Sequence, residues 1–248
     1  MKRKIIKRND TISIATACFN EEKNIKNTLE NWIYYFKYKV KFKKFEIIIT
    51  DDGSFDKTVE IINKIKKKNK QIKLYRFKKN MGAALAFRNS INLSKNKYVL
   101  INDCDNQFPI KNFIKLWEEI SKNKTDAVIG SRDRLRDFTL LNLGSLWSGK
   151  FLNYIYNTKI DDFNCALKLI KSSVIKKINL EAIGLNYSTD MTAKLIEKNF
   201  KISNVKIFHN KNKKRKKFFK IIKDSASRII FILYLILRLI LKKTKIIF

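Results

Sequence analysis

The sequence predicts an α/β fold, in which helices flank a twisted and mostly parallel β-sheet. Short apolar runs alternate with longer amphipathic stretches along the chain, and this alternation is typical of βαβ units. Runs such as Phe45–Thr50 and Tyr98–Asn102 are rich in Ile, Leu and Val, which is the pattern of strands buried on both faces. The length of 248 residues suits one such domain with a short extension.

Strands and helices alternate regularly before residue 132. Five apolar runs predict strands: Thr11–Ala17, Phe45–Thr50, Lys73–Phe77, Tyr98–Asn102 and Ala127–Ser131. Stretches with apolar residues at helical spacing predict the helices between them: Glu21–Phe36, Lys57–Lys68, Gly82–Ser94 and Ile110–Lys122. Asn20 and Ser54 stand just before two of these helices, so we expect their side chains to serve as N-caps.

The remaining elements end in a change of composition. We expect two helices and two strands beyond residue 138: Leu141–Tyr156, Cys165–Ile170, Thr189–Lys198 and Ile202–Phe208. The run Lys211–Lys217 is strongly basic, and a segment with helical periodicity follows it from Phe218 to Leu241. We therefore divide the chain into a domain of residues 1–210 and a basic linker with an amphipathic helix at residues 211–248.

The C-terminal helix has an apolar side and a polar side. Its apolar stretch, Ile229–Leu241, has 13 residues and contains Arg238, whereas a membrane span needs about 20. Polar residues recur near multiples of 3.6: Lys220, Asp224, Ser227, Arg228, Arg238 and Lys242. This pattern predicts a helix that lies along a membrane surface with its basic side toward anionic headgroups. The alternative is a helix packed on the domain itself, or on a partner subunit in an oligomer.

The chain is strongly basic, with 55 Lys and Arg against 22 Asp and Glu and a net charge of +33. Such a field attracts polyanions, including nucleic acid, anionic lipid and phosphorylated small molecules. Lysines are spread along the whole chain while acids concentrate at strand ends, so we expect no specific nucleic-acid partner and keep nucleic-acid binding as the alternative from another class. Three separated cysteines and one histidine, His209, argue against a disulfide framework and a zinc site. No apolar segment follows the basic N-terminus, so we expect no signal peptide and a cytoplasmic protein.

Two carboxylates follow the predicted strand Tyr98–Asn102, at Asp103 and Asp105. In extended backbone, side chains at i and i+2 point to the same side, here just beyond the carboxyl end of a strand, where open α/β sheets bind ligands. Two adjacent carboxylates repel unless a cation lies between them, and a hard divalent ion with oxygen ligands satisfies that need. Gln107 could add a neutral oxygen. The alternative is an ordinary turn into the next helix.

A second acidic pair, Asp51 and Asp52, ends the strand Phe45–Thr50. Gly53 allows a tight turn there, and a carboxylate at this edge could accept hydrogen bonds from a base or a ribose. The alternative is a βα turn in which the acid caps backbone amides.

Taken together, the motifs resemble family 2 glycosyltransferases, and most closely the branch that acts on polyprenyl phosphates such as dolichol phosphate. Six motifs in order carry the resemblance over roughly residues 11–210: Phe19–Glu22, Asp51–Ser54, Asn80–Gly82, Asp103–Pro109, Gly130–Arg132 and Asp162–Lys168. The resemblance implies a GT-A fold and a nucleotide-sugar donor. Ala17 and Ala166 depart from the usual proline and glycine of the family, which affects the expected acceptor more than the donor.

The resemblance also implies roles for individual residues. On the donor side it implies Asn20, Glu21, Asp51, Asp52, Asn80 and Gly82, with the acids holding the base and ribose. For the metal, Mg²⁺ or Mn²⁺, it implies Asp103, Asp105 and Gln107. For donor or acceptor phosphate it implies Arg132, with Lys168 as a further candidate.

For the acceptor, the resemblance implies a polyprenyl phosphate, used with inversion at the cytoplasmic face of a membrane in cell-envelope glycan synthesis. A lipid phosphate is already ionised at pH 7 and needs no general base. If the acceptor is instead a hydroxyl of a glycan or glycolipid, a base is desirable, and Asp190 is the candidate. The alternative for Asp190 is an acid favoured by the dipole at a helix start.

Overall fold

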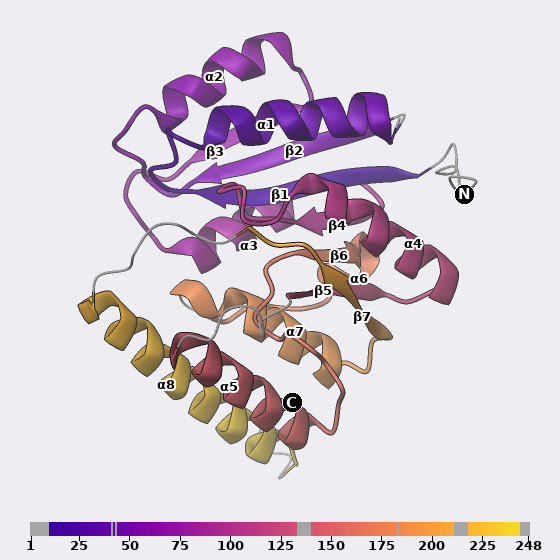
Figure 1. Ribbon diagram of the computed structural model, residues 1–248, viewed down its shortest axis with the longest axis vertical. Coiled ribbons are helices and arrows are strands. Elements are labelled where there is room, and N and C mark those ends of the chain that lie inside the picture. The colour runs from indigo at the N-terminus through magenta and orange to yellow at the C-terminus, as the bar shows by residue number, and fades with distance from the viewer. Residues whose placement is uncertain are drawn as a thin grey trace.

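The computed structural model describes residues 10–40, 42, 44–132, 140–182, 184–210 and 218–243 (Figure 1). Within these ranges, side chains are described for all residues except 140–146, 185, 218–223 and 243. The basic run Lys211–Lys217 therefore lies outside the described residues, as does the side chain of Lys220.

Seven strands form one sheet in the order β3-β2-β1-β4-β6-β5-β7. Their bounds are β1 Thr11–Cys18, β2 Lys44–Asp51, β3 Ile72–Arg76, β4 Tyr98–Ile101, β5 Ala127–Arg132, β6 Lys168–Lys171 and β7 Ile202–Ile207. All neighbours pair in parallel except β6, which runs antiparallel to both β4 and β5. The prediction of a mostly parallel sheet is confirmed.

The antiparallel β6 determines which residues meet at the edge of the sheet where the parallel strands end, which we call the functional edge. The parallel strands β1, β2, β4, β5 and β7 all end at this edge, and the register pairs Cys18 with Asp51 and Arg132 with Ile207. Because β6 runs the other way, its first residue, Lys168, lies at the same edge, paired with Ile101 of β4. One edge of the sheet therefore collects strand-end acids and a strand-start lysine.

Helices surround this sheet and follow most of the predicted ranges (Figure 1). Their bounds are α1 Ile25–Tyr34, α2 Thr58–Lys68, α3 Ala83–Leu93, α4 Phe113–Asn123, α5 Leu140–Tyr156, α6 Ser172–Ile175, α7 Tyr187–Glu197 and α8 Phe218–Lys243. A five-residue π-helical segment, Tyr35–Lys39, extends α1, and short 3₁₀ turns at Ile110–Asn112 and Gly184–Asn186 precede α4 and α7.

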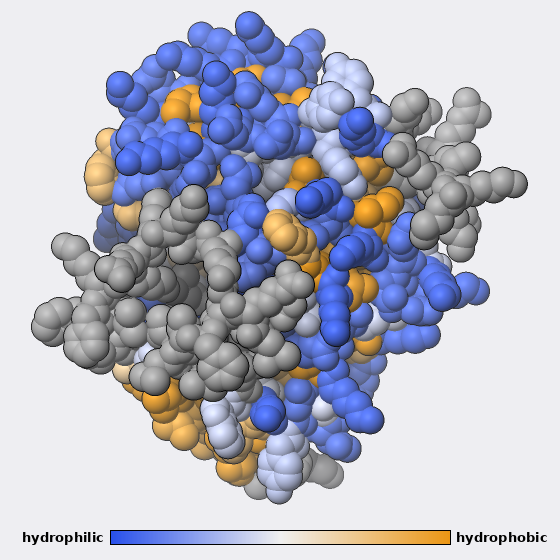
Figure 2. All heavy atoms as spheres, viewed as in Figure 1, coloured by the Kyte–Doolittle hydropathy of each residue, from blue (hydrophilic) through white to orange (hydrophobic). Residues whose placement is uncertain are grey.

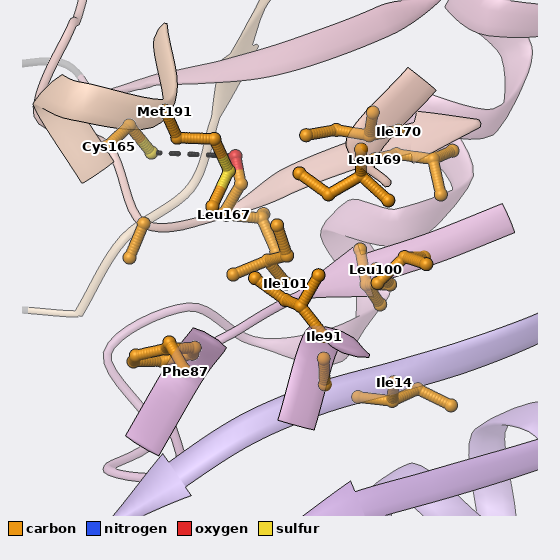
Figure 3. Close-up of a cluster of buried hydrophobic side chains, with 14 of the residues drawn as sticks. Ile14, Phe87, Ile91, Leu100, Ile101, Cys165, Leu167, Leu169, Ile170 and Met191 are labelled. Atoms are coloured by element: carbon orange, nitrogen blue, oxygen red, sulfur yellow. Dashed lines mark hydrogen bonds between the residues drawn. The ribbon is translucent and has the colours of Figure 1, made fainter. Parts of the chain in front are cut away.

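The core joins helices to the sheet through apolar side chains. Figure 3 shows Ile14 of β1, Ile91 of α3, Ile101 of β4 and Met191 of α7 packed in one buried cluster. Burying such side chains is the main favourable term in folding. This core fixes α3 and α7 against the strands that end at the functional edge.

The predicted N-caps are wrong. The first helix begins at Ile25, five residues after Asn20, and the second begins at Thr58, four residues after Ser54. The two side chains instead link the loops that follow β1 and β2. The backbone amide of Asn20 donates to the Ser54 hydroxyl at 2.9 Å, and the backbone amide of Phe55 donates to the side-chain oxygen Oδ1 of Asn20 at 3.1 Å. A polar residue before a helix can thus serve the neighbouring loop instead of its own helix.

The structure corrects the predicted orientation of the C-terminal helix. Arg238 of α8 points into the domain and is only 6% exposed, with its guanidinium 3.1 Å from Asp190 and 3.2 Å from Glu181. Glu197 accepts hydrogen bonds from both Arg238 and Lys242. Three carboxylates of the domain therefore attract the basic side of α8, and its apolar side faces outward.

Candidate functional site

The loops after β1 and β2 lie together because their strands pair in register up to Cys18 and Asp51. Asp51 is fully buried, and its carboxylate accepts from the Ser54 amide at 3.0 Å and lies 3.3 Å from Arg76 Nε. Glu21 is only partly buried, and its carboxylate accepts from the Asn24 side chain at 2.6 Å. Asp51 thus shapes the turn, while Glu21 stays partly accessible beside it.

Asp52 links the loop after β2 to the start of α3. Its carboxylate accepts hydrogen bonds from the backbone amides of Met81, at 2.7 Å, and Gly82, at 3.0 Å. Burial raises the pKa of Asp52, while these two amides lower it and the charge of Asp51 raises it further. The contact brings Asn80 and Gly82 next to the acidic pair, so the residues expected on the donor side converge at one place.

The close approach of these loops requires Gly53. Its φ angle is +75°, in the region that L side chains rarely adopt. A Cβ atom at this position would lie 2.6 Å from the carbonyl carbon of Lys79 and 2.8 Å from the Asn80 nitrogen. Only glycine lets the loop after β2 pack this closely against the segment before α3.

The loop after β4 presents Asp103 and Asp105 at the same edge. Between them, Cys104 points inward, where its thiol donates to the Ala17 carbonyl at 3.1 Å, and its own carbonyl accepts from the Thr28 hydroxyl at 3.0 Å. The buried middle residue holds the loop so that both neighbouring carboxylates remain only partly buried. That the two carboxylates point to the same side stays a prediction.

The charges of the two acids interact. Burial, and then the negative charge of Asp105, raise the pKa of Asp103 to about 7, although a hydrogen bond of 2.9 Å from the Tyr187 hydroxyl lowers it. Positive charge beside the pair would favour the ionised form of both carboxylates. Two carboxylates in this state suit a hard divalent cation such as Mg²⁺ or Mn²⁺, which prefers oxygen ligands.

Gln107 lies beside Asp105, with its amide nitrogen toward the carboxylate. Its side-chain nitrogen donates to Asp105 at 2.5 Å, and its backbone amide donates to the other carboxylate oxygen at 3.0 Å. Among the described residues no group of three or more His, Cys, Asp or Glu side chains is assembled for a metal. The residues that could hold one are therefore Asp103 and Asp105, with Gln107 orienting Asp105.

Arg132 ends β5 and is held by Asp162. The guanidinium donates to both carboxylate oxygens, from Nε at 2.7 Å and from a terminal nitrogen at 3.0 Å. This two-point pairing fixes the plane of the guanidinium and uses two of its five N–H groups. Sequence analysis placed Asp162 in a motif without a role, and the structure shows that it positions Arg132.

Lys168 lies behind Arg132 and is completely buried. Its ammonium group donates to the Cys165 carbonyl and, at 2.6 Å, to the Ser188 hydroxyl. Burial lowers the pKa of Lys168 to about 8, and the charge of Arg132 also lowers it. With its hydrogen bonds directed inward, Lys168 influences the edge of the sheet through its charge.

Asp190 lies in α7 and has no exposed surface. One carboxylate oxygen accepts from the Glu181 and Ala182 amides at 2.6 and 2.9 Å, and the other pairs with Arg238. A general base must reach the proton that it removes. The geometry therefore favours a structural role for Asp190 over the base role considered from the sequence.

Two residues that sequence analysis did not assign lie at the site. Tyr187, three residues before Asp190, donates to Asp103 and stacks on Phe87 with ring centroids 4.3 Å apart. His209 follows β7 and lies beside the Asp103–Pro109 loop, since the Asn210 amide donates to the Gln107 carbonyl at 2.8 Å. The sequence signal that could have placed His209 at the site was its position directly after a predicted strand, because the ends of the parallel strands meet at this edge.

The sequence model of the family described as glycosyl transferase family 2 matches residues 13–178. This stretch contains both acidic pairs, Arg132 and Lys168, and so covers most of the edge just described. The chain belongs to glycosyl transferase family 2. The resemblance predicted from the six motifs is thereby confirmed.

Some curated relatives of this family 2 chain are named for prenyl phosphates, and others are poly-beta-1,6-N-acetyl-D-glucosamine synthases of Staphylococcus. The S. epidermidis enzyme is 26% identical over 199 residues, which are 77% of this chain and 45% of that protein. The dodecaprenyl-phosphate galacturonate synthase of Rhizobium johnstonii is 24% identical over 172 residues, which are 68% of this chain and 50% of that protein. The dolichyl-phosphate beta-glucosyltransferase of Dictyostelium discoideum is 28% identical over 183 residues, which are 67% of this chain and 56% of that protein. The chain thus spans about half the length of these relatives.

Solved structures show the same fold as this family 2 chain. Glucosyl-3-phosphoglycerate synthase from Mycobacterium tuberculosis, crystallised with Mn²⁺, uridine diphosphate and phosphoglyceric acid, superposes with a TM-score of 0.68 at 14% identity. The match covers 92% of this chain and 78% of that one. At this identity the likeness concerns the fold, and the expected GT-A architecture is confirmed.

Proposed function

We propose that the protein transfers a sugar from a nucleotide-sugar donor to a polyprenyl phosphate at a membrane surface. The observation that carries this proposal is the juxtaposition at one sheet edge of the Asp103–Asp105 pair with the cations Arg132 and Lys168. The acids suit a metal that binds a diphosphate, and the cations suit a second anion. Both prenyl-phosphate relatives support this choice of acceptor.

The reaction places negative charge on the leaving group. An acceptor phosphate oxygen attacks the anomeric carbon, the bond from that carbon to the diphosphate breaks, and the nucleoside diphosphate leaves with the electron pair. This single displacement inverts the anomeric configuration. Asp103 and Asp105 would hold Mg²⁺ or Mn²⁺, which neutralises the developing charge of the diphosphate. The Mn²⁺ and uridine diphosphate in the M. tuberculosis enzyme support this assignment.

The proposed acceptor side carries positively charged side chains. A phosphate monoester is an ionised nucleophile at pH 7, so it needs cationic cover more than it needs a base. Arg132 is oriented by Asp162 and has N–H groups left over for a phosphate oxygen. The burial of Asp190 beside Arg238 argues against its role as the base for a hydroxyl acceptor. The geometry therefore favours the lipid phosphate over the glycan hydroxyl.

The outward face of α5 and α8 fits a lipid surface. Large apolar side chains on both helices are exposed: Trp147, Phe151, Tyr154, Ile229, Ile230, Leu233, Leu237 and Ile240. Figure 2 shows apolar side chains gathered at the lower edge of the molecule, over the position of α8 in Figure 1. No helix of the described chain combines the length and the hydropathy that a membrane crossing requires. We propose that this face rests in the membrane interface, with the aromatic rings at headgroup level.

A transfer assay tests the function. Purified protein with Mn²⁺, a panel of nucleotide sugars and detergent-solubilised undecaprenyl phosphate should release nucleoside diphosphate and form a prenyl-phospho-sugar, detected by mass spectrometry. Asp105→Asn should lower turnover by at least about a hundredfold, since charge stabilisation of this kind is worth several kcal/mol. Glu60→Gln removes an exposed acid on α2 and serves as the matched control. Turnover that appears only with a hydroxyl acceptor would contradict the proposed acceptor, and no donor turnover at all would contradict the function.

A further inference from the structure

Each acid of the Asp103–Asp105 pair accepts hydrogen bonds from its own donor residue. Gln107 donates to both oxygens of Asp105, at 2.5 Å from its side chain and at 3.0 Å from its backbone amide. Asp103 accepts from the Tyr187 hydroxyl at 2.9 Å. Gln107 belongs to the same loop as the two acids, whereas Tyr187 reaches Asp103 from the start of α7. The orientation of Asp103 therefore depends on how firmly a residue of another element is held.

The ring of Tyr187 is held by α3. It stacks on Phe87 with the ring centroids 4.3 Å apart and the ring planes 17° apart, and both residues are buried. A buried ring in such a stack has little freedom to turn. The N-cap residue of α3 is Gly82, whose backbone amide donates to Asp52. One helix thus contacts the donor-side acid at its start and fixes the Tyr187 ring further along.

The backbone of Tyr187 is held by its two neighbours in the sequence. The Asn186 side chain donates to the Ser227 hydroxyl of α8 at 3.2 Å. On the other side, the Ser188 hydroxyl donates to the Cys165 carbonyl at 2.7 Å. These contacts tie the first turn of α7 to α8 and to the segment before β6. The Tyr187 hydroxyl therefore has a defined position beside the acidic pair.

A side chain that ligates a metal is commonly oriented by a hydrogen bond from a second residue. Tyr187 fits this description, because its hydroxyl donates to a carboxylate oxygen of Asp103 and its ring is fixed by packing. We propose that Tyr187 is a positioning residue, which holds Asp103 in the orientation that binds the divalent cation. This inference rests on the proposed function, because it concerns the metal assigned to that same site.

Replacing Tyr187 by Phe tests this role, since the variant keeps the stacked ring and loses the hydroxyl. Binding of Mn²⁺ to the full chain, without nucleotide, is measured from the loss of the EPR signal of free Mn²⁺. The Kd for Mn²⁺ should rise by about 10- to 100-fold, the usual effect of losing such a partner. The Mn²⁺ concentration that gives half of the maximal transfer rate should rise as well.

Tyr156→Phe provides the matched control. It removes a hydroxyl that also donates to a carboxylate at 2.9 Å, in this case Glu197 at the other end of α7. Both variants should unfold at a lower urea concentration than the wild type, because each loses one hydrogen bond. The Kd for Mn²⁺ should change in Tyr187→Phe and stay unchanged in Tyr156→Phe.

Three results would overturn the inference: an unchanged Kd in a folded Tyr187→Phe protein, an equal rise in Tyr156→Phe, or a wild type that binds no Mn²⁺. The second of these would attribute the effect to a weakened α7. Because Mn²⁺ binding needs no turnover, a wild type that binds Mn²⁺ but transfers no sugar would contradict the proposed function alone.

Discussion

The guanidinium of Arg238 and the carboxylate of Asp190 form a buried ion pair, 3.1 Å apart, that joins α8 to α7. Asp190 also accepts hydrogen bonds from the backbone amides of residues 181 and 182. The acid that the sequence suggested as a base therefore fastens the C-terminal helix to the domain.

Replacing Asp190 by Asn should destabilise the protein. The substitution removes one buried charge-assisted hydrogen bond, which costs about 1–3 kcal/mol, while Glu181 and Glu197 continue to pair with Arg238. The free energy of unfolding from urea titration measures this loss. Lys242→Gln, which breaks the exposed pair with Glu197, should cost less than about 1 kcal/mol. A stable Asp190→Asn protein without transferase activity would instead support the base role.

The raised pKa of Asp103 predicts how pH acts on the metal-free protein. Its carboxyl titrates near pH 7 when folded and near 3.8 when unfolded, so between these values the folded state binds the extra proton. The free energy of unfolding should therefore fall as the pH rises from about 4 to about 7. Asp103→Asn should lack this component, which a comparison of urea titrations across pH reveals.

Mn²⁺ should reverse this trend, since the metal and the proton compete for Asp103. Thermal stabilisation by Mn²⁺ should grow from pH 5 to pH 8 in the wild type. Equal stabilisation at both pH values would contradict the assignment of Asp103 as a ligand.

Gly53→Ala should destabilise the protein and weaken donor binding. A left-handed backbone costs a non-glycine residue about 1–3 kcal/mol, and the added Cβ would also collide with the backbone of Lys79 and Asn80. Thermal unfolding and nucleotide titration measure the two effects. Gly149→Ala is the control, because a Cβ there meets nothing within 4 Å and should be neutral or stabilising.

Polar substitutions on the outer face of α8 should release the protein from lipid vesicles. Ile230→Ser and Leu233→Ser each remove an apolar side chain whose burial is worth about 1.5–3 kcal/mol, so each should weaken binding roughly tenfold or more. Co-sedimentation with anionic vesicles measures the effect. Tyr38→Ser alters an exposed aromatic residue beyond α1, far from α8, and should change nothing (Figure 1). Equal sedimentation of all variants would refute this docking face.

The fold and the donor edge could be predicted because local patterns encode them. Apolar runs and the acids that follow them placed β1, β2 and β4, and parallel strands bring their ends to one edge without any long-range information. The antiparallel direction of β6 could not be predicted in this way, because the direction of a strand depends on which neighbouring strands it pairs with. The location of Lys168 at the functional edge follows from that direction.

The roles of α8 and Asp190 depend on tertiary contacts that periodicity does not contain. The polar stripe of α8 was visible, but the three carboxylates that attract it lie at residues 181, 190 and 197. Asn20 and Ser54 show the same limit, because an N-cap pattern does not reveal a second loop that competes for the side chain. The sequence pattern identified these polar residues, but it did not reveal which residues they form hydrogen bonds or ion pairs with.

The seating of α8 also bears on how the protein is handled. Truncation after residue 217, which would otherwise be an obvious way to improve solubility, would remove the cations that pair with the buried acids Asp190 and Glu197 and would bare the surface that α8 covers. The segment that looks like a detachable tail supplies partners to buried acids of α7, so solubility is better sought by changing its outer surface than by removing it.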